Sequence, residues 1–533
     1  MSTDGPATTS ARPENAGRPA RNPWLIALIV TMATFMEVLD TTIVNVALSH
    51  IAGNLSAGLD ESTWVLTSYL VSNAIILPMS GWFSSLLGRK RFYMTCVALF
   101  TVSSFLCGFA PSLGWLIFFR VLQGLGGGGL QPSEQSILVD TFPAEKRGMA
   151  FAVAGIAMLT APSIGPTLGG WITDNYNWRW CFYINIPIGI LSLILTSRFV
   201  TDPPHARPIR FREGFRIDYI GLGLIALGLG ALQIVLDKGE REDWFDSSFI
   251  QGLALIALVA LVFAVFWELR ERQPVVDLKL LGERNFGIAN LLMFMVGFAL
   301  FGSSVLIPQM LQTQMGYTAQ QAGMVLSLGA LVVMVMMPMV GFLVSRIQPK
   351  WMVLFGVAVQ AASLFYMTRF NLQMDFQTAM WARCFQAFGL AFLFVPINTA
   401  AYAYLPPGKN NNASALINLS RNMGASFGIS AVTTLLAQRA QFHQNQLVGH
   451  LTPYDLNYQT ALERITERMI SAGVGAVDAA RRAEAVVYRM LEQQATMLAY
   501  IDNFWILGWL FLAILPLVFL LKRIERGKGA AMH

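Results

Sequence analysis

Two carboxylic acids, Glu37 and Asp40, lie three residues apart inside an otherwise apolar segment. At about 100° per residue they share one helix face with Thr41 and Asn45, so this face must meet water, substrate or protein rather than lipid. Acids at such depth in a membrane are rare and are candidates for function. Burial and a neighbouring acid both favour the protonated form of a carboxyl group, so the pair could hold a proton near neutral pH. The alternative is a packing role, with each acid satisfied by hydroxyl or backbone groups.

A second polar face runs along the apolar segment 115–138, within about 80° of arc. It carries Arg120, Gln123, Gln131 and Glu134. Counted at about 1.5 Å per residue from the same end of their segments, Arg120 and Asp40 lie at similar depth. This predicts an Asp40–Arg120 pair in which protonation of the acid releases the arginine; a static pair that only neutralises both charges is the alternative. Glu134 lies nearer the opposite mouth, where it could attract cationic substrates or cap a helix end.

The elements that position these residues are helices that cross a membrane. The chain is 55% hydrophobic and only 13% charged, with a mean hydropathy of +0.52, whereas soluble domains carry about 25% charged residues. Stretches of about 20 apolar residues are long enough to cross a hydrocarbon core of about 30 Å. We predict an all-α integral membrane protein with fourteen transmembrane helices. Their approximate ranges are 24–48, 63–84, 92–110, 115–138, 149–172, 179–199, 217–236, 249–268, 287–311, 322–344, 351–369, 379–404, 413–436 and 498–521.

The distribution of Lys and Arg predicts that both termini are cytoplasmic. With this orientation the cytoplasmic segments hold 24 of these residues and the short outer loops hold four, as the positive-inside rule requires. The tails 1–23 and 522–533 are then cytoplasmic. The longer loop 437–497 lies outside, in the periplasm of a two-membrane bacterium, and has helical patterning. It is either a solvated hairpin that caps the bundle or a docking surface for a partner. The four cysteines lie in apolar segments and the five histidines at segment ends, loops or tails, which argues against disulfides, haem or a metal centre.

The chain contains an internal repeat. "FRVLQGLG" around Arg120 and "ARCFQAFG" around Arg383 align with an offset of 263 residues. This makes 24–199 and 287–521 two copies of one six-helix half, with two inserted helices in 217–268 between them. Duplicated helical halves around a central cavity are typical of transporters. By the repeat, Arg383 is expected to mirror Arg120.

These motifs resemble the major facilitator superfamily, and more closely its fourteen-span drug/proton antiporters of the EmrB type. The resemblance covers almost the whole chain and is carried by "LDTTIVNVAL", "GWFSSLLGRKR", "LIFFRVLQGLGGGG", "APSIGPTLGGWI" and "DNYNWRWCFYINIPIGI". It implies the major facilitator fold, with a central cavity lined by the first and fourth spans. It also implies that the string of Pro162, Gly165, Pro166, Gly169 and Gly170 in span 5 is the antiporter motif, which acts as a hinge and proton seal between the halves.

The loop between spans 2 and 3 resembles the superfamily motif at Gly81, Gly88, Arg89 and Lys90. It departs from that motif at Ser85, where an acid is usual. The charge network of this loop must then be weaker or use another acid. In the second half, Asn418 and Arg421 are further candidates to face the cavity. So many embedded arginines keep anionic or neutral amphipaths open as substrates.

The sequence therefore predicts an inner-membrane, proton-driven exporter of amphipathic drugs and toxic compounds that works by alternating access. No cofactor beyond the proton gradient is expected, since no phosphate-binding loop motif is present. The resemblance implies a periplasmic adaptor protein and an outer-membrane channel as partners. A dedicated exporter of fatty acids, siderophores or another metabolite is the alternative. An ion-translocating subunit of a respiratory complex would need lysines near span centres, and a lipid-modifying enzyme would need a catalytic constellation; the sequence favours neither.

Overall fold

The computed structural model describes residues 22–202, 218–406 and 408–523. Within these ranges the chain is helical and contains no strand. The predicted cytoplasmic tails, 1–23 and 522–533, lie almost wholly outside the described residues.

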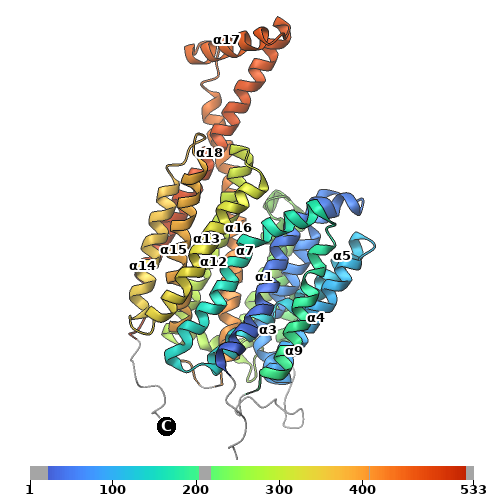
Figure 1. Cartoon of the computed structure of the whole chain (residues 1–533), viewed down its shortest axis with the longest axis vertical. Helices are drawn as coiled ribbons and strands as arrows, with labels where there is room; N and C mark the ends of the chain where they lie inside the picture. Colours follow the sequence, from blue (N-terminus) through green and yellow to red (C-terminus); the bar gives the residue numbers. More distant parts are fainter. Residues whose placement is uncertain (1–21, 203–217, 407, 524–533) are drawn as a thin grey trace, which may run out of the picture.

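Fifteen long helices form the bundle (Figure 1). They are α1 (Pro23–Asn54), α3 (Trp64–Leu87), α4 (Arg89–Phe109), α5 (Leu113–Gly127), α6 (Leu130–Thr141), α7 (Arg147–Asn175), α9 (Asn185–Phe199), α10 (Tyr219–Lys238), α11 (Ser248–Arg270), α12 (Arg284–Met315), α13 (Ala319–Leu343), α14 (Pro349–Met367), α15 (Phe376–Ala401), α16 (Asn410–Val448) and α18 (Ala476–Phe519). Short helices and turns connect them: α2 (Leu59–Ser62), α8 (Trp180–Tyr183), α17 (Leu456–Ser471) and 3₁₀ turns at Ala144–Lys146, Trp244–Asp246 and Leu278–Gly282.

Thirteen helical spans of the described chain are long and apolar enough to cross a membrane. The remaining predicted span, 413–436, lies within α16. This helix runs through the bundle against α12 and α18. Its many polar residues keep it below the hydropathy typical of a membrane helix, although residues such as Asn418 and Arg421 are buried. Fourteen crossings of the membrane are therefore consistent with the structure.

The predicted fourth span is two helices, α5 and α6, that meet at Gly128 and Gly129. Glycine is needed here because neighbouring helices approach the backbone closely. A Cβ built on Gly128 would lie 2.6 Å from the Asn73 carbonyl oxygen, and one on Gly126 would lie 2.7 Å from the Phe100 nitrogen. The glycine run thus lets this span pack tightly between α3 and α4.

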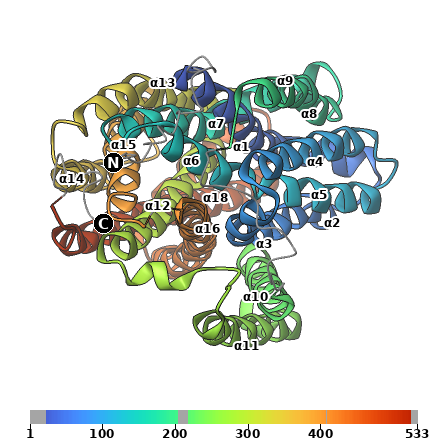
Figure 2. The same ribbon diagram turned by 90° about the horizontal axis from the view of Figure 1, so that it is seen from below.

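The helices fall into two groups, seen end-on in Figure 2. Helices α1 to α9 pack together on one side, α12 to α18 on the other, and α7 contacts α13 between them. The inserted helices α10 and α11 lie at the periphery beside α3. Helix α10 also touches the second group, because Ser426 donates a hydrogen bond to Gln233 at 3.0 Å. Helix α11 exposes large apolar side chains, among them Leu255 and Leu258, as a lipid-facing helix does.

The two ends of the bundle differ. Helix α1 begins and α18 ends at the lower end in Figure 1, which we call the N/C end. At the opposite end α16 and α18 continue well beyond the other helices, and α17 crosses their tips. The predicted loop 437–497 is therefore mostly an extension of two membrane helices. We call it the hairpin. It projects away from the bundle and does not cap it, because α16 and α18 both continue without a break beyond the ends of the other helices.

Candidate functional site

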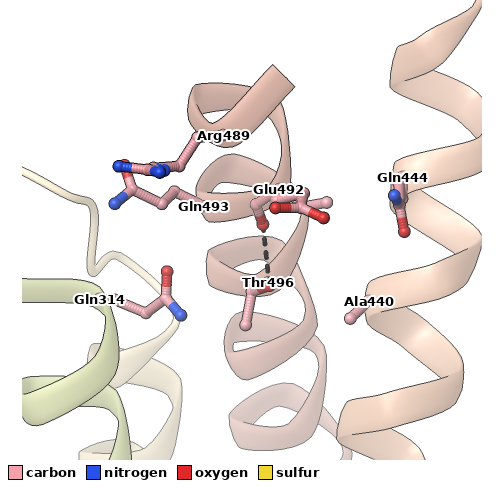
Figure 3. A pocket seen from close by; sticks show the side chains of 8 residues that line it. Gln314, Ala440, Gln444, Arg489, Glu492, Gln493 and Thr496 are labelled. Carbon is pink, nitrogen blue, oxygen red and sulfur yellow. Dashed lines mark hydrogen bonds between the residues drawn. The ribbon is translucent and has the colours of Figure 1, made fainter. Parts of the chain in front are cut away.

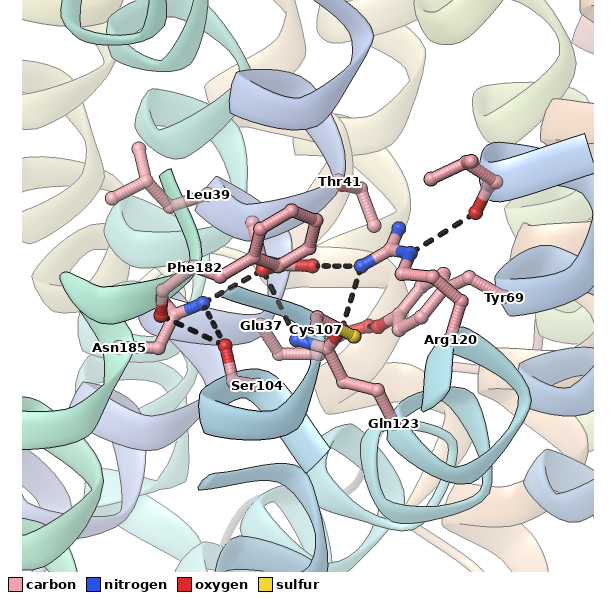
Figure 4. Close-up of polar contacts among 12 residues, drawn as sticks. Glu37, Leu39, Thr41, Tyr69, Ser104, Cys107, Arg120, Gln123, Phe182 and Asn185 are labelled. Atoms are coloured by element: carbon pink, nitrogen blue, oxygen red, sulfur yellow. Dashed lines mark hydrogen bonds and ion pairs between the residues drawn. The ribbon is translucent and has the colours of Figure 1, made fainter. Parts of the chain in front are cut away.

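Asp40 and Arg120 form a buried ion pair between α1 and α5 (Figure 4). Arg120 Nη1 donates to Asp40 Oδ2 at 2.6 Å, and both side chains are 0% exposed. The other oxygen, Asp40 Oδ1, accepts from Gln123 Nε2 at 3.1 Å and from Asn185 Nδ2 at 2.7 Å. The contact expected from their depth is therefore present, and three donors surround the carboxylate. Its part in proton coupling stays a prediction.

The Arg120 guanidinium is held from several sides. Its Nε donates to the Val65 carbonyl at 3.0 Å and its Nη1 to Gln123 Oε1 at 2.8 Å. The guanidinium carbon lies 4.3 Å from the centre of the Tyr69 ring and 5.7 Å from that of Phe182. Aromatic faces attract cations, more strongly where water is excluded. Arg120 is therefore fixed beside Asp40 by groups that do not depend on the acid.

Glu37 lies one helical turn from Asp40 and is also buried, at 4% exposed. It accepts hydrogen bonds from Tyr69 Oη at 2.9 Å, from Asn73 Nδ2 at 3.2 Å and from Gln131 Nε2 at 2.7 Å. Tyr69 thus touches both charged centres, because its ring covers Arg120 while its hydroxyl donates to Glu37. The two acids of α1 belong to one continuous polar network.

This network crosses to the second half. Arg421 Nη2 of α16 donates to Gln131 Oε1, whose amide nitrogen donates to Glu37. Arg421 is 1% exposed, and its Nε and Nη1 have no hydrogen-bond partner. Glu134 is 2% exposed and accepts from the Thr31 hydroxyl at 2.6 Å. Glu134 therefore lies inside the bundle, neither at an open mouth nor at a helix end.

The other cavity candidates are placed differently. Thr41 is half-buried, and its hydroxyl donates to the Val38 carbonyl at 2.8 Å, while Asn45 is exposed. Asn418 is 0% exposed and donates to Gln135 of α6 at 2.9 Å. Asn418 lines no open space in this conformation, because the halves close around it. Thr41 and Asn45 remain available to a ligand on α1.

The N/C end is closed by a second charged cluster. Arg89 pairs with Asp140 of α6, and its Nε donates to Asn411 of α16 at 3.0 Å. Asn410, also of α16, donates to Asp140 at 2.6 Å. Asp140 is thus the acid that serves Arg89, while the Ser85 hydroxyl donates only to the backbone of its own helix. The basic loop motif is joined to the second half although its usual acid is missing.

The glycines of this loop explain how closely the halves approach. A Cβ built on Gly81 would lie 2.5 Å from Asn412 Oδ1 and 3.0 Å from Asn412 Cα, so α3 and α16 touch there. Gly88 has φ +84°, a left-handed conformation that favours glycine. Lys90 instead faces its own half, donating from Nζ to the Ser197 carbonyl at 2.7 Å and from its backbone to Asp202 at 2.8 Å. The described structure is therefore sealed at the N/C end.

The proline–glycine string lies within one continuous helix, α7, with Pro162 and Pro166 in its interior. A Cβ on Gly165 would collide with Thr42 of α1, and one on Gly169 would lie 3.0 Å from the Ile43 carbonyl oxygen. A Cβ on Gly170 meets nothing within 4 Å, so the close helix approach expected of this glycine is wrong. Gly165 and Gly169 face α1.

On its other side α7 contacts the second half. Ser327 of α13 donates to the Ser163 carbonyl at 3.2 Å. A carbonyl oxygen has two lone pairs, so it can accept this bond in addition to one within its own helix. Helix α7 thus lies between the halves, as its motif implies, although its action as a hinge stays a prediction.

A polar cavity of 290 Å³ lies at the base of the hairpin (Figure 3). It is lined by Gln314, Ala440, Gln444, Arg489, Glu492, Gln493, Ala495 and Thr496. None of these residues belongs to the network around Asp40. The cavity is too polar for an amphipath to bind mainly by burying apolar surface, so the chemistry of interest lies deeper, between α1, α5 and α16.

Known proteins are similar to this chain along almost its whole length. Residues 30–429 match the Major Facilitator Superfamily. The chain belongs to the major facilitator superfamily. It is 36% identical over 499 residues to the multidrug export protein EmrB of Escherichia coli K12, covering 93% of this chain and 95% of that protein. It is 35% identical over 500 residues to the fatty acid resistance protein FarB of Neisseria gonorrhoeae, covering 93% and 96%.

A solved structure supports the same fold. The proton:xylose symporter XylE superposes with a TM-score of 0.60 at 13% identity, covering 93% of this chain and 95% of that one. This chain is thus a multi-pass membrane transporter of the major facilitator fold and not an enzyme.

Some residues of this transporter's network were absent from the predicted site. Tyr69 and Asn73 lie four residues apart on α3, and Asn185 begins α9. The only signal for the first two is that spacing, which puts two polar side chains on one face of an apolar helix. For Asn185 and for Asp140 the sequence offers no comparable signal, because their roles depend on which helices pack together.

Proposed function

We propose that this protein is a proton-driven antiporter that exports amphipathic drugs and other toxic compounds across the inner membrane by alternating access. The observation that carries the proposal is the Asp40–Arg120 pair, a fully buried carboxylate and cation within one half of a transporter. Ionisable groups inside a membrane mark ion pathways. The names of the relatives, multidrug export for EmrB and fatty acid resistance for FarB, support export as the direction and amphipaths as the cargo.

The proton steps follow from the hydrogen bonds. An ionised Asp40 accepts from three donors, and a proton on either oxygen displaces one of them. Protonated Asp40 also no longer balances the charge of Arg120, which is then attracted more strongly to the Tyr69 ring that already covers it. Since the Tyr69 hydroxyl donates to Glu37, this stronger attraction to the ring alters the contacts of Glu37. Protonation at Asp40 is in this way communicated to the acid that faces the second half.

Glu37 connects proton binding to the contact between the halves. Gln131 bridges Glu37 and Arg421, and this bridge favours the closed N/C end while Glu37 is charged. A proton on Glu37 removes the negative charge that attracts Arg421, so the bridge weakens and the N/C end can open. Release of the proton restores the bridge and closes that end again. Substrate that entered from the N/C end is then exposed at the hairpin end.

The excess of Lys and Arg in the segments at the N/C end supports a cytoplasmic location for that end, with both termini inside. The hairpin then projects into the periplasm. It exposes Tyr454, Leu456 and Val477, at 96%, 75% and 74%. Exposed apolar residues of this kind suit contact with a periplasmic adaptor protein, which with an outer-membrane channel would complete the export path.

A dedicated exporter of fatty acids, siderophores or another metabolite is the second candidate. The buried Arg421, with two unpartnered nitrogens beside the network, favours substrates that carry a carboxylate. The same transport cycle serves either cargo, so the two candidates differ in substrate and not in mechanism.

Everted membrane vesicles test the proposal. A pH-sensitive dye reports the proton gradient while lipophilic cations, weak-acid uncouplers or a medium-chain fatty acid are added to the native protein, D40N or E240Q. Glu240 is an exposed acid remote from the site and serves as the matched control. A compound that dissipates the gradient with the native protein and E240Q, but not with D40N, establishes antiport and identifies the substrate class. Equal responses from all three proteins, after the response of vesicles without the protein is subtracted, would refute proton coupling at Asp40.

A further inference from the structure

Two buried acids lie together where α10 begins and α11 ends, outside the network around Asp40. Asp218 is the N-cap residue of α10 and is 8% exposed. Glu268 lies in the last turn of α11 and is 2% exposed. Acidic residues are rarely buried to this degree unless they are paired. Neither acid forms an ion pair with any residue of the described chain.

Each acid has one oxygen with hydrogen-bond donors and one without. Asp218 Oδ1 accepts from the Gly221 backbone at 2.8 Å and from Trp267 Nε1 at 2.9 Å. Glu268 Oε2 accepts from the Val276 backbone at 3.2 Å. The other two oxygens, Asp218 Oδ2 and Glu268 Oε1, are buried and have no hydrogen-bond partner within the described residues. A buried carboxylate oxygen without a donor is costly, so the arrangement requires a hydrogen that no N–H or O–H group of the described chain supplies.

The two unpartnered oxygens point at the same place. A Cβ built on Gly221 would lie 2.5 Å from Glu268 Oε1 and closer still to Asp218 Oδ2, so these oxygens are neighbours. Two ionised carboxylates side by side repel each other, and one of them therefore holds a proton more readily. We propose that Asp218 and Glu268 share one proton and form a proton-binding site separate from Asp40.

The bound proton satisfies both oxygens at once. It comes from the solution and forms an O–H bond with one carboxyl group, which then donates a hydrogen bond to the other. The second carboxyl group keeps its negative charge, so the pair carries one charge instead of two. A proton needs no cavity, because it lies within the hydrogen bond that joins the two oxygens.

The charged groups on the neighbouring elements do not take the place of this proton. Glu271 follows α11 and adds a further negative charge, and α3, which packs against α10, contains no charged residue. Lys409, which precedes α16, pairs with Asp277. Three basic residues of α11 and the segment after it are exposed and pair with neither acid: Arg270, Arg272 and Lys279.

The site is connected to the seal at the N/C end. Glu268 holds the backbone of Val276, and the next residue, Asp277, accepts from Lys409 Nζ at 2.6 Å. Lys409 directly precedes α16, whose first residues bond the ion pair that closes this end. Loss of the shared proton sets two negative charges against each other and loosens the segment that Glu268 holds. The closed N/C end thereby becomes sensitive to the pH on that side.

Infrared spectroscopy of the full chain in detergent tests the site, because protonated carboxyl groups absorb apart from carboxylates. E268Q and D218N each replace one acid with an amide whose N–H takes the place of the shared proton. E240Q changes an exposed acid and is the matched control. At neutral pH we expect the native protein and E240Q to show a carboxyl band that is missing from both E268Q and D218N.

Two spectra would overturn the proposal. If the native spectrum matches that of E268Q, both acids are ionised and no proton is bound between them. If the band disappears in E268Q but stays in D218N, the proton belongs to Glu268 alone and is not shared.

The pH dependence of unfolding provides a second measurement. A folded state that holds a proton which the unfolded chain releases loses stability as the pH rises. Relative to E268Q, the folded-to-unfolded ratio of the native protein should fall by up to about tenfold per pH unit from mildly acidic pH until the pair loses its proton. The other buried acids are the same in both proteins and cancel in this comparison. An identical pH dependence of the two proteins would contradict the shared proton.

Thiol labelling tests the connection to the seal. Ser136 of α6 is buried at the N/C end and bonds Asn411 of α16. At an alkaline pH where the native pair has lost its proton, a thiol reagent should label S136C severalfold faster in the native background than in E268Q at the same pH. Equal rates would show that the acid pair does not act on the seal. None of these measurements involves transport, so their results do not depend on the proposed function.

Discussion

Variants of the Asp40–Arg120 pair separate two effects. One is the loss of stability when a single charge is removed, and the other is the loss of proton coupling. D40N keeps the size of the side chain but turns one of its oxygens into an amide that donates. Arg120 Nη1, Gln123 Nε2 and Asn185 Nδ2 all point at this group. The new amide nitrogen therefore faces other hydrogen-bond donors, and the buried Arg120 loses its negatively charged partner.

Breaking a buried ion pair by removing one partner costs about 3–5 kcal/mol. Tyr69 and Phe182 still cover the guanidinium in D40N. Because aromatic faces attract a cation more strongly where water is excluded, we expect the loss to lie at the lower end of this range. We therefore expect D40N to lower the free energy of unfolding by about 3 kcal/mol.

The double variant D40N/R120Q removes the lone charge together with the acid. Its free energy of unfolding should recover to within about 1 kcal/mol of the native value, because replacing both members of a buried pair is often nearly neutral. Proton coupling should stay absent in both variants. Unfolding in mixed detergent–SDS micelles, followed by tryptophan fluorescence, measures stability, and the vesicle dye assay measures coupling.

Two results would refute this reasoning. If the double variant were as unstable as D40N, the loss would come from disturbed packing and not from an unpaired charge. If the double variant still coupled transport to protons, Asp40 would be a structural acid and the proton would bind elsewhere, with Glu37 the next candidate.

Three further outcomes are expected. D140N breaks the ion pair at the N/C end. Ser136 of α6 is buried there beside Arg89 and Asn411, so a thiol reagent should label S136C severalfold faster in D140N than in the native background; an unchanged rate would show that the amide contacts alone seal this end. G165A should lower the free energy of unfolding by about 1–3 kcal/mol through overpacking against α1. G170A, which meets open space, should leave it unchanged. Equal effects of the two substitutions would contradict the assigned packing. Y69F keeps its ring over the arginine but loses a hydrogen bond to a carboxylate, so unfolding should become easier by about 1.5–3 kcal/mol and the vesicle response should weaken; an unchanged response would remove the hydroxyl from the proton route.

The fold was largely predictable from two signals in the sequence. Long apolar runs indicate the membrane helices, and the placement of basic residues indicates their orientation. The exceptions have physical causes. Span 413–436 is polar along its length because α16 meets other helices and not lipid. The helical patterning predicted for 437–497 agrees with α17 and the ends of α16 and α18. The sequence did not show that α16 and α18 continue into this segment without a break, which they can do because an α-helix satisfies its backbone hydrogen bonds without any neighbour.

The part of the site that could be predicted is the part that follows from the charge of a residue and its depth within one helix. Asp40 and Arg120 are charged residues in apolar segments, and their similar depth predicted the pair that the structure contains. Asn185 is an uncharged residue of a distant segment, and its approach to Asp40 depends on how α9 is rotated against α1. Asp140 could not be matched to Arg89 either, because only the packing of α6 beside the start of α4 joins them.

The charges inside the membrane are divided unequally between the halves, and this inequality bears on how the protein works. The buried acids of the network, Glu37, Asp40 and Glu134, all belong to the first half, whereas the second half contributes the buried cations Arg383 and Arg421. If protons bind these acids as proposed, they change the charge of only one face of the contact between the halves among the described residues. Each proton then weakens the attraction to Arg421 opposite, so the proposal predicts that one titrating half is sufficient to open and close the transporter.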